Sequence, residues 1–193
     1  MHKRMSPHGD ADHMVEASDI VDNFKVKNVI LNCGEYNPLE INLINKLNKD
    51  YYTCIDKINL DDLTLSFLNT KEYNNENDNS SVIIFDYYNY NFLFMGDASI
   101  KREKDILNSS DLSSIDFLKV GHHGSDTSSS KEFIDIIKPK YSIISVGRNN
   151  RYGHPKESVL DVLNNCKIYR TDLIGSIEIK LNKNTYKIKT YSP

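Results

Sequence analysis

The sequence predicts an α/β fold in a single domain of residues 1–193. Short apolar runs rich in β-branched and aromatic residues, typical of strands, alternate along the chain with segments whose apolar residues recur at helical intervals. No internal repeat, linker or change of composition divides the chain. With 39% hydrophobic and 26% charged residues, 193 residues have the composition of a globular domain with one core.

In the first half of the chain, the pattern predicts a helix at residues 14–24, followed by a buried strand at 26–31. Pro38 then begins a helix that runs to Leu47, because the fixed backbone of proline suits the first helical position. Apolar residues at every third or fourth position give this helix one apolar face. Strands are expected at 51–55 and 63–68, and a polar, asparagine-rich loop at 72–80.

In the second half, a hairpin is expected, because two β-rich runs at 81–87 and 91–95 flank the short segment 88–90. Helix and strand patterns then alternate as far as residue 170, and two more strand patterns follow. The expected helices are 100–107, 131–137 and 155–163, and the expected strands are 117–120, 141–146, 167–170, 176–181 and 186–191.

The net charge of −3 indicates no broad basic surface, so contact with nucleic acid is expected to be local or mediated by a metal. No run approaches the roughly 18 apolar residues that a membrane span needs, and no apolar segment follows the basic N-terminus as in an export signal. We therefore expect a cytoplasmic location for the chain as it stands. Cys33, Cys54 and Cys166 are odd in number and far apart, and are expected to be reduced.

Histidine, aspartate and glycine are concentrated in four short strings. Five of the six histidines lie in residues 8–13, 120–125 and 152–155, and residues 94–97 add the carboxylate of Asp97. Imidazole nitrogens and carboxylate oxygens are ligands for divalent metal ions in hydrolytic sites, and neighbouring glycines let the backbone turn sharply around them. The sequence therefore predicts a metal-dependent hydrolytic site.

Three of these strings come after predicted strands. Asp97 follows one strand, His122 and His123 follow the next, and His154 lies in the loop that follows a third. Residues at strand ends and helix entries of α/β folds point into the crevice where such folds bind ligands. These side chains are therefore expected to meet in one pocket, although they are far apart in the sequence.

The first string favours two metal ions, because its four potential ligands within six residues exceed what one ion can accept along with a substrate oxygen. His8 and Asp10 can serve one ion, and Asp12 and His13 the other, which leaves Asp97 to bridge them. Two ions about 3.5–4 Å apart can hold a hydroxide as the nucleophile and stabilise the leaving oxygen of an ester.

Residues 8–13 resemble the histidine-aspartate signature of the metallo-β-lactamase fold, and Gly96-Asp97 resembles its later bridging aspartate. Further motifs are similar to the hydrolase domain of the ComEC family of competence proteins: residues 78–82, 94–98, 119–125, 144–147, 150–155, and 170–172 with 175–176. The resemblance implies an αββα sandwich and a metal-dependent hydrolase, a phosphodiesterase or nuclease acting on DNA and linked to DNA uptake.

The resemblance also implies roles for individual residues. The implied metal ligands are His8, Asp10, Asp12, His13, Asp97 and one of His122 and His123. Asp12 and His154 are the catalytic candidates, with His154 as a further ligand or a proton donor to the leaving oxygen. Apart from the resemblance, Ser125, Arg151 and Tyr152 are candidates for substrate contact; Arg151 and Tyr152 could bind a phosphate or a base, or belong to an exposed loop without a function. The implied cofactors are two divalent ions, Zn²⁺ or Mn²⁺ with Mg²⁺ as a further option, and the implied partners are single-stranded DNA and a separate membrane channel component.

Two departures from the family pattern leave other functions open. Residues 79–81 stand where many members of the fold have a histidine, and only seven residues precede His8, so part of the first sheet is expected to be missing. The alternatives are a non-catalytic remnant that acts as a binding module and a hydrolase of lactones or cyclic nucleotides. Residues 128–130 could contact phosphate, or Ser129 and Glu132 could form a capping box.

Overall fold

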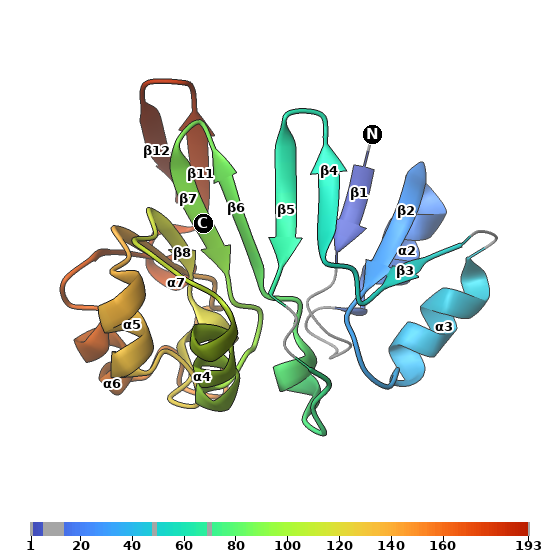
Figure 1. The fold of residues 1–193 in the computed structure, drawn as a ribbon, viewed down its shortest axis with the longest axis horizontal. Coiled ribbons are helices and arrows are strands. Elements are labelled where there is room, and N and C mark those ends of the chain that lie inside the picture. Colours follow the sequence, from blue (N-terminus) through green and yellow to red (C-terminus); the bar gives the residue numbers. More distant parts are fainter. Residues whose placement is uncertain (1, 6–13, 48–49, 69–70, 193) are drawn as a thin grey trace.

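The computed structural model describes residues 2–5, 14–47, 50–68 and 71–192, with residues 2–5 described by their backbone. Its strands form two sheets and a separate hairpin (Figure 1). The first sheet has the order β1 (His2–Met5), β2 (Val26–Leu31) and β3 (Tyr52–Thr53), and its neighbouring strands are parallel. The hairpin consists of β11 (Ser176–Leu181) and β12 (Tyr186–Tyr191).

The second sheet has seven strands in the order β10, β9, β8, β7, β6, β5, β4. Four neighbouring strands, from β7 to β10, are parallel, and the remaining pairs are antiparallel. The strand bounds are β4 (Lys57–Leu60), β5 (Leu63–Phe67), β6 (Ile83–Tyr87), β7 (Tyr90–Phe94), β8 (Phe117–Lys119), β9 (Tyr141–Ile144) and β10 (Lys167–Arg170). Tyr88 and Asn89 have φ angles of 51° and 66°, which form a tight turn between β6 and β7.

Helices cover the outer face of each sheet (Figure 1). Against the first sheet lie α2 (Ala17–Asn23) and α3 (Pro38–Lys46), which share a core with β2 that includes Ala17, Val29 and Leu43. Against the second sheet lie α4 (Ile100–Ser109), α5 (Lys131–Ile137) and α6 (Glu157–Val162), whose core includes Ile106, Leu118 and Ile137. The expected helices and their apolar faces are therefore confirmed.

The two sheets meet through a smaller apolar cluster. Ile30 of β2 packs with Leu65 and Phe67 of β5 and with Ile83 of β6. This contact gives the layer order helix, sheet, sheet, helix, and it confirms the predicted αββα class. The first sheet contains three strands in the part of the chain that the structure describes.

Aromatic rings hold the C-terminal hairpin on the inner face of the second sheet. Because side chains alternate along a strand, Phe92 and Phe117 lie on the face opposite the helix-covered Leu93 and Leu118. The rings of Phe92 and Phe117 stack with centroids 4.7 Å apart, and the ring of Tyr186 meets Phe117 edge to face at 5.3 Å. These contacts anchor β12 to the sheet.

Among the strands and α-helices of the described residues, three lie outside the sequence expectations: β1, β4 and the short helix α7 (Thr171–Ile174). The backbone of β1 pairs with the buried strand β2, which stabilises an extended segment whose sequence, His-Lys-Arg-Met, has no strand-like apolar pattern. The strand expected at 51–55 is shorter than predicted, since β3 contains only Tyr52 and Thr53.

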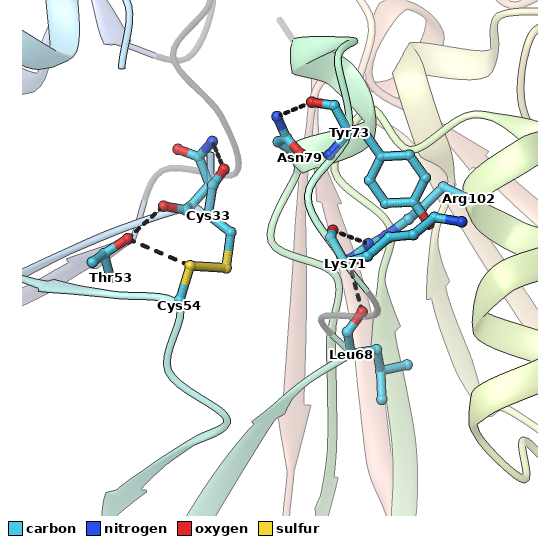
Figure 2. Close-up of a disulfide and its surroundings, with 9 residues drawn as sticks. Cys33, Thr53, Cys54, Leu68, Lys71, Tyr73, Asn79 and Arg102 are labelled. Atoms are coloured by element: carbon cyan, nitrogen blue, oxygen red, sulfur yellow. Dashed lines mark hydrogen bonds between the residues drawn. A yellow bond between two sulfur atoms is a disulfide. The ribbon is translucent and has the colours of Figure 1, made fainter. Parts of the chain in front are cut away.

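The expectation that all three cysteines are reduced is wrong for two of them. Cys33 and Cys54 form a disulfide with a Cα–Cα separation of 4.7 Å, although 21 positions separate them (Figure 2). The reason is strand pairing: Leu31 lies opposite Thr53, so the residues that leave β2 and β3 are neighbours in space. Cys166 is the free cysteine.

Candidate metal centre

Asp97 lies in the loop that follows β7, and its side chain is buried. Gly96 has φ 56°, a backbone conformation that glycine adopts without strain, and this turn directs Asp97 across the end of the strand. The Asp97 N–H donates to Ser80 Oγ at 3.0 Å, and the Ser99 N–H donates to Asp78 Oδ1 at 3.0 Å. The loop before β6 therefore holds the Asp97 loop at two points.

His122 and His123 follow β8 in a turn with left-handed backbone at both residues, φ 46° and 54°. Such conformations cost on the order of 1–3 kcal/mol for residues other than glycine and persist only where neighbouring contacts hold them. Here the His122 N–H donates to the Gly96 carbonyl at 2.9 Å, which joins the histidine turn to the Asp97 loop. A Cβ atom at Gly124 would lie 2.5 Å from Pro155, so this position also requires glycine.

The two imidazoles present their Nε2 atoms to the same carboxylate. His122 Nε2 lies 3.8 Å from Asp97 Oδ2, and His123 Nε2 lies 4.0 Å from Asp97 Oδ1. Each ring is oriented through its other nitrogen, with His122 Nδ1 3.1 Å from Thr127 Oγ1 and His123 Nδ1 2.7 Å from the Ser145 carbonyl. Orientation of a ligating imidazole through its second nitrogen is the usual arrangement at protein metal sites.

His154 completes the group of side chains. Its ring centroid is 6.0 Å from that of His122, and Asn150 binds its backbone at both the N–H (2.9 Å) and the carbonyl (2.7 Å). His154 Nδ1 is buried and has no hydrogen-bond partner within the described part of the chain. Burial, followed by the charge of Lys156, lowers the pKa of His154.

Lys119 and the residues that support Asp97 were not predicted as site residues. Burial lowers the pKa of the Lys119 ammonium, and attraction to Asp97 opposes this shift. Its Nζ donates to the Val120 carbonyl at 3.1 Å. Asp78, Ser80 and Lys119 all lie within motifs that carry the ComEC resemblance, but residue type alone does not distinguish a supporting contact from a ligand.

The donor types fit a divalent metal, but these donors do not form a complete shell. Two ligand atoms on a tetrahedral ion are about 3.4 Å apart, slightly closer than the 3.8 and 4.0 Å found here. Within the described residues, no group of three or more His, Cys, Asp and Glu side chains is close enough to hold an ion. The predicted ligands His8, Asp10, Asp12 and His13 lie outside the described residues.

The candidates for substrate contact fall into two environments. Ser125 is buried, and its hydroxyl lies 3.0 Å from that of Thr127. Arg151 and Tyr152 are exposed beside His154, and the Tyr152 and His154 ring centroids are 5.7 Å apart. A role for these three residues in substrate contact stays a prediction.

The prediction of a capping box formed by Ser129 and Glu132 is wrong. The N-cap of α5 is Ser130, whose side chain accepts from the Phe133 N–H at 3.3 Å. The Ser129 N–H instead donates to the buried carboxylate of Glu103 on α4. Burial raises the pKa of Glu103, and its hydrogen bonds from Ser129 and Ser130 oppose that shift.

The αββα layers, and a carboxylate and imidazoles that converge at the strand ends, define the class of protein. The chain belongs to the metallo-beta-lactamase superfamily, whose family model matches residues 8–148. Members of this superfamily generally bind divalent metals, and membership indicates a metal-dependent hydrolase. No helix in the described segments is long and apolar enough to cross a membrane.

The curated relatives are competence proteins of the ComEC family, as the motifs predicted. ComE operon protein 3 of Bacillus subtilis (strain 168) is 29% identical over 196 residues, covering 96% of this chain and 25% of that protein. Recombination protein 2 of Haemophilus influenzae is 34% identical over 116 residues, 59% of this chain and 14% of that protein. Competence protein ComA of Neisseria gonorrhoeae is 40% identical over 72 residues, which cover 36% of this chain and 10% of that protein. The chain thus spans a quarter or less of each relative.

Solved structures share the fold at low identity. CmlA, a diiron β-hydroxylase from Streptomyces venezuelae, has a TM-score of 0.59 and 10% identity over 98% of this chain and 45% of that chain. Igni18, a metallo hydrolase from Ignicoccus hospitalis, has a TM-score of 0.51 and 10% identity over 99% of this chain and 80% of that chain. At this identity the likeness is evidence for the fold alone.

Proposed function

We propose that this chain is a metal-dependent phosphodiesterase that cuts DNA during competence and DNA uptake. One observation carries the proposal: the Nε2 atoms of His122 and His123 both face the buried carboxylate of Asp97, while the Thr127 hydroxyl and the Ser145 carbonyl orient their other nitrogens. The names of the relatives, which refer to competence and recombination, support DNA as the substrate.

The proposed ligands are Asp97, His122 and His123 together with His8, Asp10, Asp12 and His13. When bound, two divalent ions, Zn²⁺ or Mn²⁺ with Mg²⁺ as an alternative, would activate a water molecule and stabilise charge on the phosphate. The chain's own contribution is orientation, because Thr127 and the Ser145 carbonyl hold the imidazoles and Ser80 holds the Asp97 backbone.

His154 is suited to contact the leaving oxygen. Its lowered pKa favours the neutral imidazole, which carries one N–H donor and one acceptor nitrogen. Its backbone is fixed by Asn150, and its ring lies beside His122. In this proposal, the ring N–H of His154 donates a hydrogen bond to the leaving oxygen, and Asp12 acts with the attacking water.

In the cell, we place this activity next to a separate membrane channel component that delivers single-stranded DNA. The names of the relatives support a setting in competence, and this chain spans a quarter or less of their length.

A second candidate is a binding module without catalysis. One observation favours it: the 3.8 and 4.0 Å between the imidazole nitrogens and the Asp97 carboxylate exceed the separation of two ligand atoms on one tetrahedral ion. Metal content distinguishes the two candidates, because a hydrolase of this kind needs bound ions and a binding module does not.

The first prediction tests catalysis. The purified chain with Mn²⁺ should cut end-labelled single-stranded DNA, and Asp97→Asn should lower the rate by more than about 100-fold, beyond the 10–100-fold typical of changes outside the ligand shell. Gel analysis of the products measures the rate, and elemental analysis measures bound metal.

Asp86→Asn is the matched control, since Asp86 is an exposed carboxylate on the neighbouring strand β6. Full cleavage by Asp97→Asn would exclude the bridging role of Asp97. A folded wild-type chain that neither binds Zn²⁺ or Mn²⁺ nor cuts DNA would exclude the hydrolase and leave the binding module as the remaining candidate.

A further inference from the structure

An exposed tyrosine lies next to the candidate metal centre. Tyr152 is 58% exposed, one of the most exposed large apolar side chains in the described part of the protein. Its ring is nearly parallel to that of His154, with an interplanar angle of 17° and a centroid distance of 5.7 Å. His154 in turn lies 6.0 Å from His122, so a continuous path of rings leads from the surface to Asp97.

The loop that carries Tyr152 is held in place from both ends. The Asn150 side chain binds the His154 N–H and carbonyl and also donates to the Gly147 carbonyl at 3.2 Å. The Lys156 ammonium donates to the Tyr152 carbonyl at 2.8 Å. The backbone around this exposed ring is thus fixed before any ligand binds, which reduces the entropy lost on binding.

The same loop concentrates positive charge on a chain whose net charge is −3. Arg148, Arg151 and Lys156 lie within nine residues of one another, and the Arg151 guanidinium lies 4.7 Å from the Tyr152 ring centroid. Two carboxylates lie near this loop. The charge of Asp126 acts on His154, and Asp172, whose carbonyl accepts from Arg148, has its carboxylate bound by Arg170. The loop is therefore a local basic and aromatic surface.

We propose that Tyr152 is a stacking platform for the base of an unpaired nucleotide, and that it gives the site a preference for single-stranded over double-stranded DNA. Arg151 covers the ring in the free chain and moves to an adjacent phosphate when the base stacks. This inference rests on the proposed function, because it assigns the nucleotide next to the phosphate that is cut.

The physical basis is the availability of the base. In a duplex both faces of each base are covered by neighbouring base pairs, whereas a single strand can present a free face to an aromatic ring at little cost. Stacking is tolerant of sequence, since every base has a π-face, so the platform would select strandedness and not sequence.

The test measures binding without cleavage. The full 193-residue chain is titrated, with EDTA present, against a single-stranded oligonucleotide that contains 2-aminopurine, whose fluorescence falls when it stacks. Wild type should quench the probe and bind it more tightly than the paired probe. Tyr152→Ala should weaken binding about 5- to 150-fold, the range that corresponds to loss of one base–aromatic stack.

Three controls make the result specific. Tyr152→Phe keeps an aromatic ring and should bind the oligonucleotide like wild type. Tyr52→Ala removes a tyrosine of similar exposure, 49%, from β3 and should leave the affinity for the oligonucleotide unchanged. The third control replaces 2-aminopurine with an abasic nucleotide, and binding is then measured by the anisotropy of a fluorescent end label. Wild type and Tyr152→Ala should bind this strand with the same affinity, because the base that stacks on the ring is absent.

Several outcomes would overturn the platform: equal binding of single and double strands by wild type, unchanged binding by Tyr152→Ala, or an effect of Tyr152→Ala that persists on the abasic strand. If the metal-loaded chain cuts DNA while any of these holds, the proposed function stands and the platform does not. If Tyr152-dependent binding is found and no divalent ion supports cleavage, the platform stands and the hydrolase does not.

Discussion

At the scale of single residues, the candidate centre depends on which nitrogen each imidazole presents. His122 contacts the Thr127 hydroxyl through Nδ1, and His123 contacts the Ser145 carbonyl. Both contacts leave Nε2 for Asp97. A backbone carbonyl cannot be removed by substitution, but the Thr127 hydroxyl can, so Thr127 offers a direct test of this orientation.

The second prediction concerns Thr127. Thr127→Val keeps the shape of the side chain and removes the hydroxyl, so we expect metal affinity or DNA cleavage to fall about 10- to 100-fold. Thr127→Ser retains the hydroxyl and should remain near wild type. Isothermal titration calorimetry with Zn²⁺ or Mn²⁺ measures the metal affinity. Equal affinities of Thr127→Val and wild type would show that Thr127 does not orient His122.

The third prediction concerns the cysteines. Burial raises the pKa of the Cys166 thiol, and only the thiolate reacts, so the folded chain should react with Ellman's reagent slowly and only as the pH rises. In denaturant without reductant, one thiol should react, and after reduction three should react. Three reactive thiols before reduction would contradict the Cys33–Cys54 disulfide.

At the scale of secondary structure, α4 holds the loop that leads to Ser80. The fully buried Arg102 side chain donates to the Leu68 carbonyl at 2.7 Å, and its guanidinium lies 5.0 Å from the Tyr73 ring centroid (Figure 2). Tyr73 also contacts Asp105 on the same helix through its hydroxyl. This network therefore links the helix to the loop whose Ser80 accepts the Asp97 N–H.

The fourth prediction tests that link. Arg102→Ala leaves the Leu68 carbonyl without its buried donor and opens a cavity, so the free energy of unfolding should fall by about 3 kcal/mol. Lys104→Ala, at an exposed position on the same helix, should change it by less than about 0.5 kcal/mol. Urea unfolding measures both values; equal stabilities would mean that Arg102 is not required to hold the loop.

At the scale of the whole molecule, the proposed ligands come from distant parts of the chain. Residues 8–13 follow β1 in the sequence, whereas Asp97, His122 and His123 follow strands of the second sheet. Within the described residues, Ile30 is the member from β2 in the apolar cluster between the two sheets. If residues 8–13 supply ligands as proposed, a bound ion would join that segment to the strand ends of the second sheet.

The fifth prediction follows from this arrangement. Zn²⁺ or Mn²⁺ at about 100 times its dissociation constant should stabilise the folded chain by about 2.7 kcal/mol and raise the melting temperature. Asp97→Asn should remove most of this shift, and Asp86→Asn should retain it. Differential scanning calorimetry measures the shift, and an identical rise for Asp97→Asn and wild type would show that the ions bind elsewhere.

Much of the fold could be predicted because periodicity reports burial. Helices such as α3 and strands such as β7 carry clear apolar patterns, and the predicted segments lie where the structure has them. The polar strand β1 could not be predicted, since pairing with β2 and not its own pattern makes it extended. The N-cap of α5 is Ser130 and not Ser129, whose backbone is left-handed with φ 61° and whose N–H donates to Glu103, distant in sequence.

By itself, the sequence determined the α/β class, the order of most elements and the strings that contain the candidate ligands, because these depend on local patterns of burial and on residue type. Tertiary structure decided which side chains meet. The approach of His122 and His123 to Asp97, the Cys33–Cys54 disulfide and the approach of His154 to His122 all require strand ends or loops to be neighbours in space. Such proximity depends on the packing of the whole chain, which a local pattern does not contain.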